Sequence, residues 1–433
     1  MASRRALVLG GYGLIGSAVM RALRAAGYEV AGVGRSRRAA LMSDPEAEWI
    51  IRDIAALATE DWRRLSAGAH VVVNAAGALQ DGARDDLEAI HVRMIERLVA
   101  ATGGRAVRIV QISAAGASQS ASSAFFRTKA RGDAIIAAGA QDWTILRPTL
   151  VLSPHAYGGT ALLRAAAALP LCLPRLLPGA QVQTVFVGDV AAAVVACADG
   201  HVRAGTIADL TEPQARPFGD LLARIRRWQG FGDAPFRPRI PERVVDLAGR
   251  CADLLGRLGW RSPLRSTAIR ALREGVRGDP APWIAAGGPP CRGLEATLAA
   301  LPATAQERLF ARFYLALPLA IATLALFWGV SGLLALADIS RAAAILTDRG
   351  ASTGLAGFAA IGGAIADICL GLAILVRPLA RRAALGMMAL SLAYLAASLP
   401  LAPDLWSDPL GPMVKVVPAG VLAFLVWFLM EER

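Results

Sequence analysis

The chain has 433 residues, enough for two or three domains and a large buried core. Its net charge is +12, and 55% of its residues are hydrophobic. The basic residues are scattered, without a zinc-finger spacing or an RNA-binding signature. This argues against a nucleic-acid partner and favours a membrane protein with arginine-rich cytoplasmic segments.

The five cysteines and four histidines are dispersed along the chain. No two cysteines form a CxxC pair, so we predict no metal site and expect free thiols in a reducing compartment. The first residues lack a cleavable apolar segment, and the N-terminal part is therefore expected to stay in the cytoplasm.

Residues 1–150 alternate short apolar runs with longer helical patterns. The runs lie at 6–10, 29–33, 49–51, 70–74, 108–112 and 143–146. Strands separated by helices of this length predict βαβ units and a doubly wound parallel sheet, that is, an α/β fold of the Rossmann type.

The stretch GGYGLIG at 10–16 follows the first predicted strand and opens a helix that Gly27 should end. Glycine at Gly10, Gly13 and Gly16 lets the turn close tightly. The backbone N–H groups of Leu14 and Ile15 at the start of the helix can then reach a pyrophosphate. In this context the pattern predicts a dinucleotide-binding site.

The end of the second predicted strand decides which dinucleotide is expected. An NAD site usually has an acidic residue there, but this chain has Arg35, followed by Arg37 and Arg38. A guanidinium can bind a 2′-phosphate through two hydrogen bonds, so NADP(H) is favoured over NAD(H). A solvated basic loop is the alternative, above all for Arg37 and Arg38.

Two later segments fit the same site. Asp53 follows the third strand, where its carboxylate could accept from the adenine amino group or cap the following helix. Asn74 ends the fourth strand, and the small residues Ala75, Ala76 and Gly77 leave room for the cofactor.

Residues 151–305 predict a smaller, α-rich substrate lobe and a linker. Prolines gather around 170–178, a strand-like run covers 183–187, and turn signals lie at 278–280 and 287–290. We therefore assign 1–305 to the nucleotide-binding domain with its lobe, and 306–433 to a second domain.

The second domain contains four apolar segments at 313–336, 355–376, 383–401 and 413–430. Each is close to the ~20 residues that cross a bilayer, although four buried soluble helices are the alternative. Arginines lie before the first segment and between the second and third, at positions 308, 312, 377, 381 and 382. This distribution predicts a multi-pass protein of the inner, cytoplasmic membrane with both termini in the cytoplasm.

Several motifs resemble the extended and atypical branches of the short-chain dehydrogenase/reductase superfamily. They are the glycine stretch, Arg35, NAAG at 74–77, ISAAGAS at 112–118, FFRTKARGD at 125–133 and ILRPTLV at 145–151. WTILRPTLVLSPHAYGG and FVGDVAAAV are most similar to the group related to the NADPH-binding accessory subunit of respiratory complex I. FWGVSGLLAL, ADICLGLAIL and DPLGPMVKVVP resemble a DoxX-like four-helix membrane domain.

The superfamily resemblance implies a catalytic Tyr, a Lys four residues later that holds the nicotinamide ribose, and an orienting Ser. Lys129 matches the Lys position, but Phe125 stands where the Tyr is expected. Ser113 ends the fifth strand, although the usual Ser position falls nearer Ala115. Tyr157 in the SPHAYGG loop is a candidate replacement proton carrier, and ordinary loop hydrogen bonding is its alternative role.

Two functions remain open at this stage. The first is a membrane-anchored, NADP(H)-dependent oxidoreductase acting on a lipid-soluble substrate such as an isoprenoid or quinone. The second is a non-catalytic NADPH-binding module that recruits or stabilises a respiratory or quinone-handling membrane complex. A transporter that uses Asp367 in the second apolar segment is a weaker third interpretation.

Overall fold

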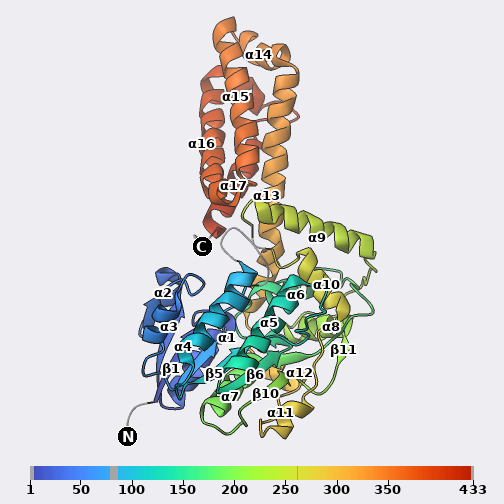
Figure 1. Cartoon of the computed structure of the whole chain (residues 1–433). Helices are drawn as coiled ribbons and strands as arrows, with labels where there is room; N and C mark the ends of the chain where they lie inside the picture. Colours follow the sequence, from blue (N-terminus) through green and yellow to red (C-terminus); the bar gives the residue numbers. More distant parts are fainter. Residues whose placement is uncertain (1–3, 79–85, 261, 431–433) are drawn as a thin grey trace. The chain divides into compact units, whose positions relative to one another are not determined.

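The computed structural model describes residues 4–78, 86–260 and 262–430. These residues form two compact units (Figure 1). The first comprises Met1–Ala252 and Pro263–Ala311, and the second comprises Asp253–Ser262 and Arg312–Arg433. The sequence-based division at 305/306 lies close to the later of these boundaries, but the short segment Asp253–Ser262 belongs to the second unit.

The first unit is built on a seven-stranded sheet with the order β10-β6-β5-β4-β1-β2-β3. Every neighbouring pair of strands in this sheet is parallel. From β1 the strand order runs outward in both directions, first through β2 to β3 and then, on the other side, from β4 to β10. The order therefore switches between β1 and β4, as in doubly wound nucleotide-binding folds. The strands are β1 (Arg4–Leu9), β2 (Tyr28–Gly34), β3 (Glu48–Ile51), β4 (Val71–Asn74), β5 (Arg108–Ile112), β6 (Asp142–Pro148) and β10 (Thr206–Leu210).

Helices cover both faces of this sheet because successive side chains of each strand point to opposite sides. Ala6 and Val8 of β1 pack with α1 (Leu14–Ala25) and α7 (Val187–Ala198). Leu7 and Leu9, the alternate residues, pack on the other face. The helices there are α3 (Thr59–Leu65), α4 (Met94–Thr102) and α5 (Ala124–Gly139).

The predicted parallel sheet is confirmed, and its six predicted strands match β1 to β6 within a few residues. The prediction missed β10, which joins the sheet edge beside β6. The strand predicted at 183–187 is confirmed, with a two-residue strand directly before it. The chain there forms β8 (Gln181–Val182) and β9 (Thr184–Phe186), which pair with β11 (Arg216–Pro217) and β7 (Leu150–Leu152) outside the main sheet.

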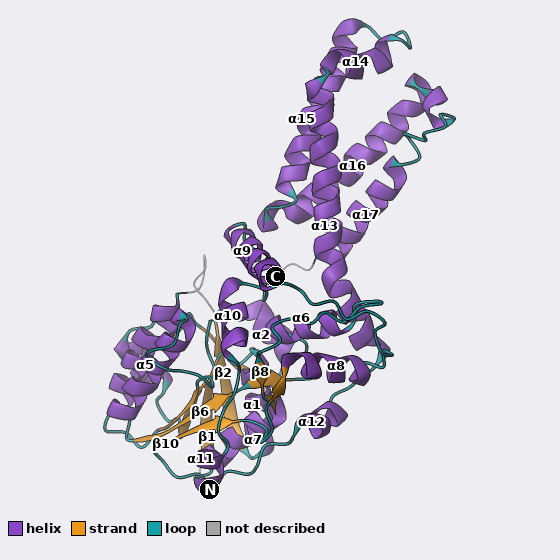
Figure 2. Cartoon of the chain, turned by 90° about the vertical axis from the view of Figure 1, so that its right-hand side faces the viewer, coloured by secondary structure: helices purple, strands orange, loops and turns teal. Residues whose placement is uncertain are grey.

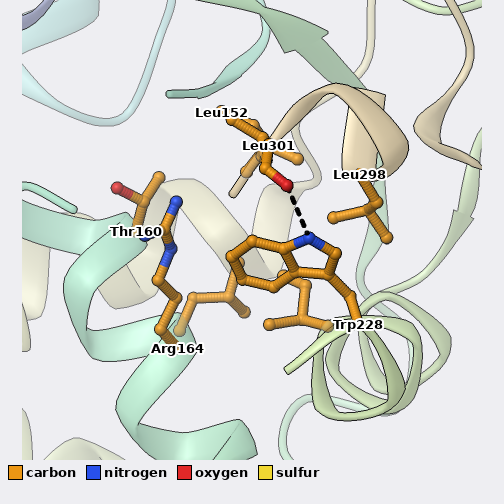
Figure 3. Close-up of a pocket in the computed structure, with 8 residues that line it drawn as sticks. Leu152, Thr160, Arg164, Trp228, Leu298 and Leu301 are labelled. Atoms are coloured by element: carbon orange, nitrogen blue, oxygen red, sulfur yellow. Dashed lines mark hydrogen bonds between the residues drawn. The ribbon is translucent and has the colours of Figure 1, made fainter. Parts of the chain in front are cut away.

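The rest of the first unit is α-rich, as expected, and has its own apolar core. It contains α6 (Gly158–Ala167), α8 (Phe218–Trp228), α10 (Ser266–Glu274), α11 (Ala281–Ala285) and α12 (Leu294–Ala300). It also contains α9 (Glu242–Arg257) as far as Ala252, and the last residues of that helix belong to the second unit. A small cavity with about 210 Å³ of empty volume, open solvent included, is lined by side chains of α6, α8 and α12 (Figure 3). The Arg164 guanidinium stacks over the Trp228 ring there, 4.9 Å from its centre.

The second unit is a helical bundle of α13 (Ala305–Ala337), α15 (Thr353–Ala373), α16 (Arg377–Leu401) and α17 (Val416–Leu429), with α14 (Ile339–Thr347) between α13 and α15 (Figure 2). Among the described residues, three helices are long and apolar enough to cross a membrane: α13, α15 and α16. The fourth predicted segment forms α17, which has 14 residues and is shorter than the ~20 that a span needs. Four spans therefore stay a prediction.

Glycines bring the helices of the bundle close together. A Cβ at Gly371 of α15 would lie 2.8 Å from the backbone nitrogen of Gly329 in α13. Large apolar side chains such as Leu326, Phe358 and Leu392 instead point outward, with exposed fractions of 67%, 79% and 66%. Close helix contacts through small residues and an apolar outer surface are typical of helices that pack within lipid.

Candidate functional site

The glycine turn between β1 and α1 is closed by direct backbone contacts. Gly10 has a φ of +71°, and a Cβ there would lie 2.9 Å from Cα of Ala76 and 3.0 Å from the carbonyl oxygen of Ala75. A Cβ at Gly16 would overlap the carbonyl of Gly10. The structure therefore brings the predicted residues of this turn and of the segment after β4 together, and side chains at Gly10 or Gly16 are excluded.

The start of α1 is suited to an anionic group. Gly13 is the N-cap residue and provides no side-chain cap, and the first turn has no acidic residue. Leu14 and Ile15 are the first two helical residues, so their N–H groups have no partner within the helix. Together with the helix dipole, these N–H groups fit a dinucleotide pyrophosphate in the space that the glycines leave.

Two aromatic rings lie beside the end of β2. The Tyr12 ring fills the space next to Gly34, and its hydroxyl accepts a 3.2 Å hydrogen bond from the backbone N–H of Arg35. The Trp49 ring packs 6.1 Å from that of Tyr12. Arg35 and Arg37 are both exposed. Basic rather than acidic groups thus follow β2, as the sequence indicated.

Asp53 does not cap a helix. Its carboxylate accepts a 3.1 Å hydrogen bond from the N–H of Ala55, which closes a local turn, while α3 begins only at Thr59. The proposed N-cap role for the following helix is therefore wrong. Asp53 is exposed, and adenine binding by its carboxylate stays a prediction.

Lys129 lies buried at the carboxyl end of the central strands. Its Nζ donates a 3.0 Å hydrogen bond to the carbonyl of Ile112, the last residue of β5. A Cβ at Gly77 would lie 3.3 Å from that Nζ. Burial lowers the pKa of Lys129 to about 8, although the negative charge of Asp133 opposes the shift. The ammonium is therefore beside the small residues that follow β4, where a ribose could contact it.

His91 is a second polar group at this position, and the sequence interpretation missed it. It lies in a π-helical turn, Ala89–Arg93, before α4. Its Nε2 accepts from the N–H of Ala78 (3.3 Å), so Nδ1 carries the proton and donates to Thr128 Oγ1 (2.9 Å). Burial and the nearby Lys129 charge lower the pKa of His91 to about 2, which keeps the ring neutral. The available signal was a histidine between two β-branched apolar residues, Ile90 and Val92, in a helical pattern.

Ser113 belongs to a buried polar network that also contains Asp133 and Arg147. Its hydroxyl donates to Asp133 Oδ2 (2.8 Å), which also accepts from Nε and Nη2 of Arg147 (3.0 and 2.9 Å). Burial raises the pKa of Asp133 despite the Arg147 charge. The Ser113 proton is thus engaged by Asp133, and its role toward a substrate stays a prediction.

Phe125 and Tyr157 have different surroundings. The Phe125 ring packs edge-on against His91, with ring centres 5.7 Å apart, one helical turn before Lys129. Tyr157 is the N-cap residue of α6 and its side chain is 60% exposed. The described hydrogen bonds of Tyr157 run through its backbone to Thr160. The structure thus places an apolar ring against the buried His91, and Tyr157 at the surface.

Two families match separate parts of the chain. Residues 6–207 match the NAD dependent epimerase/dehydratase family, and residues 325–424 match the DoxX-like family. No curated protein is significantly similar to the chain in sequence. The first match covers the parallel sheet with the glycine turn and Lys129, and the second covers most of the helical bundle.

Solved structures share the fold of the first unit. MoeE5 in complex with UDP-glucuronic acid and NAD is 18% identical over 72% of this chain and 99% of its own, with a TM-score of 0.53. The Bordetella bronchiseptica enzyme WbmH in complex with NAD⁺ is 17% identical over 69% and 97%, with a TM-score of 0.52. The terminal R domain from the myxalamid biosynthetic pathway is 17% identical over 69% and 89%, with a TM-score of 0.50. At these identities the likeness establishes the fold.

Proposed function

We propose that this chain, in which an NAD-dependent epimerase/dehydratase-like domain of the short-chain dehydrogenase/reductase type is joined to a DoxX-like domain, is a membrane-anchored NADP(H)-dependent oxidoreductase. The observation that carries the proposal is the buried Lys129 ammonium next to Gly77, on the same sheet edge as the glycine turn. Its substrate is lipid-soluble, of the isoprenoid or quinone type, because the chain that binds the nucleotide also provides helices suited to a bilayer.

The residues of the site divide the work in this proposal. Backbone N–H groups at the start of α1 bind the pyrophosphate, and Arg35 binds the 2′-phosphate. Lys129 holds the hydroxyls of the nicotinamide ribose, and the neutral His91 supports the turn beside Gly77 through Ala78. The bound nicotinamide supplies the hydride chemistry. Tyr157 is the proposed proton carrier, and Ser113 orients the carbonyl group of the substrate.

The test uses the full chain reconstituted in lipid nanodiscs with NADPH and a panel of quinones, isoprenoid aldehydes and fatty aldehydes. We expect NADPH oxidation that depends on the added lipid and is lost in Lys129→Met. Tyr157→Phe should lower kcat and leave the NADPH Kd unchanged. Tight NADPH binding without oxidation across the whole panel would contradict the proposed activity.

A specific observation favours the second function, a non-catalytic NADPH-binding module that recruits or stabilises a membrane complex. Phe125 provides no proton where the resembling enzymes use a Tyr, and the Ser113 hydroxyl is engaged by Asp133. Under this alternative the nucleotide stabilises the domain and exchanges slowly.

Phe125→Tyr separates the two functions, with Phe126→Tyr as a matched control on the same helix. A reductase that depends on Tyr157 should keep its activity in both variants. A binding module should show no turnover in the wild type, and any activity gained should appear only in Phe125→Tyr. Co-purification of NADPH with partner membrane proteins would support the second function.

A further inference from the structure

Helix α9 has two separate apolar faces. Val245, Gly249 and Ala252 form the buried face. A Cβ at Gly249 would lie 2.8 Å from Cδ1 of Ile269, so α9 and α10 pack closely there. This contact explains one side of the helix, but it leaves a second set of apolar side chains unexplained.

The second set forms an exposed apolar stripe along α9. Leu247 and Leu254 are 60% and 59% exposed, and Val244 is 52% exposed. Cys251, also exposed, lies between the two leucines. These residues are three or four positions apart, so they share one face of the helix. An exposed stripe of this kind on a helix with another, buried face indicates a binding surface.

A row of arginines borders the apolar stripe. Arg243, Arg250 and Arg257 recur every seven residues, and all three are exposed. Each lies three or four positions from Leu247 or Leu254, so the row and the stripe are neighbours on the helix surface. The acidic Asp246 lies beside this row, three positions from Arg243 and four from Arg250, and its carboxylate pairs with Arg273 of α10 at 2.8 Å. The exposed side of α9 thus combines apolar and positive groups.

The residues that follow α9 are fixed to the helical bundle. The carbonyl of Leu258 accepts a 3.0 Å hydrogen bond from the N–H of Arg377, the first residue of α16. Nε1 of Trp260 donates to the carbonyl of Leu375 (2.6 Å), and the Arg377 guanidinium lies 5.5 Å from the Trp260 ring centre. Trp and Arg at the end of an apolar helix are typical of the membrane–water interface. The carboxyl end of α9, from Asp253 onward, belongs to the second unit and therefore lies near the end of the bundle where α16 begins.

We propose that α9 is an interfacial helix that lies on an anionic lipid surface. The apolar stripe enters the boundary between headgroups and acyl chains, and the arginine row binds the lipid phosphates. The inference rests on the proposed membrane embedding of α13, α15 and α16. A protein that covers the stripe is the competing occupant, and the test below distinguishes it.

Cys251 provides a native labelling position in the centre of the stripe. The remaining accessible cysteines, Cys172, Cys291 and Cys369, are replaced by Ala, while the buried Cys197 is kept. The full chain is labelled with the environment-sensitive fluorophore NBD and reconstituted in nanodiscs. We expect a blue-shifted emission that lipids with a spin label near the headgroup quench, more strongly when a third of the lipid is anionic.

Position 42 on α2 (Arg37–Ser43) is the control, because Met42 is 74% exposed in the first unit. NBD at Met42→Cys, with Cys251 also replaced by Ala, should keep a solvent-like emission that the spin-labelled lipids do not quench. If this label were quenched as strongly as the label at Cys251, the contact would not be specific to α9 and the inference would be overturned.

Two sets of variants separate the apolar and electrostatic contributions. Leu247→Glu with Leu254→Glu should abolish the blue shift and the quenching, and both side chains are exposed enough for the fold to tolerate the change. Arg243→Gln, Arg250→Gln and Arg257→Gln together should remove the dependence on anionic lipid. Gln at the exposed Arg63, Arg64 and Arg127, a matched triple, should leave that dependence unchanged.

The outcomes also distinguish this inference from the proposed function. Release of the chain from membranes by alkaline carbonate would overturn both. An embedded chain with solvent-like emission at Cys251 would overturn the interfacial helix alone. So would a blue shift without lipid quenching, since a protein or a second copy of the chain would then cover the stripe.

Discussion

At the scale of single residues, Lys129 shows how burial prepares a group for binding. Its Nζ donates a hydrogen bond to the carbonyl oxygen of Ile112 and lies close to Gly77. Since water is excluded there, the ammonium is less stable than on the surface, and its pKa falls to about 8 from a model-compound value of 10.5. Ribose hydroxyls would replace part of the lost hydration.

This low pKa predicts a decline in nucleotide affinity above pH 8. If the charged form binds the ribose, the NADPH Kd should rise as pH passes about 8, by at most about tenfold per pH unit. NADH should show the same slope because the ribose is shared. Isothermal titration from pH 6.5 to 9.5 measures how the Kd changes with pH. Lys129→Met should bind NADPH weakly, with a Kd that does not depend on pH in this range. An unchanged slope in that variant would contradict the assignment.

The stability of the first unit should change in the opposite direction. The pKa of Lys129 is lower in the folded chain than in the unfolded chain, so the unfolded state binds more protons between about pH 8 and 10.5. The contribution of Lys129 to the free energy of unfolding therefore rises with pH in this window. Chemical denaturation of the wild type and Lys129→Met as a function of pH isolates that contribution.

Under the proposed function, Arg35 at the end of β2 distinguishes NADPH from NADH. Its removal by Arg35→Ala should weaken NADPH binding by roughly tenfold, the size of one charge-assisted interaction at an exposed site, and leave NADH almost unaffected. Arg63→Ala, an exposed arginine on α3, is the matched control. If the wild type bound NADH and NADPH with equal affinity, the proposed preference for NADP(H) would be contradicted without any variant.

At the scale of elements, the contact between α5 and the π-helical turn determines the site. Gly132 of α5 lies against the backbone carbonyl of His91, where a Cβ would overlap. Because α5 also carries Lys129 and Phe125, its distance from this turn sets the positions of the ammonium and the imidazole together. π-Helical turns within helices frequently occur at functional sites, which agrees with the position of His91.

Gly132→Ala should therefore affect the fold and the site together. The added methyl group must push α5 away from the His91 turn, which we expect to destabilise the first unit by about 1–3 kcal/mol and to weaken NADPH binding. Gly219→Ala is the control, since no atom lies within 4 Å of its added Cβ. Thermal denaturation and NADPH titration of both variants check this; identical results for the two would refute the close-contact argument.

At the scale of the whole molecule, the chain combines two units whose outer surfaces differ in polarity. The first buries its apolar side chains in a sheet-centred core, whereas the second exposes many of them on long helices. The match to the epimerase/dehydratase family lies within the first unit, and the match to the DoxX-like family lies within the second. A membrane would supply the apolar surroundings that the outer surface of the bundle lacks in water.

Two compact units predict two thermal transitions in detergent. NADPH at 100 times its Kd should add about 2.7 kcal/mol to the unit that binds it, so only one transition should move to higher temperature. Scanning calorimetry of the full chain with and without NADPH measures both. A single transition, or equal shifts of both, would contradict independent units.

The sequence alone determined the parallel sheet, the glycine turn and the apolar character of the C-terminal region. Each of these features follows from a pattern within a short segment of the sequence. Strand and helix periods alternate, glycines recur where a turn must close, and apolar segments approach the length of a membrane span. The same local reading missed β10 because its pairing with β6 joins segments distant in the chain.

Only the tertiary structure decided which side chains meet at the site and which surfaces stay exposed. His91 joins Lys129, and Ser113 joins Asp133 and Arg147, because β4, β5 and β6 end at the same sheet edge. The stripe on α9 likewise became visible only when packing against α10 accounted for the opposite face. Contacts between distant segments depend on the packing of the whole fold, and no local pattern in the sequence encodes them.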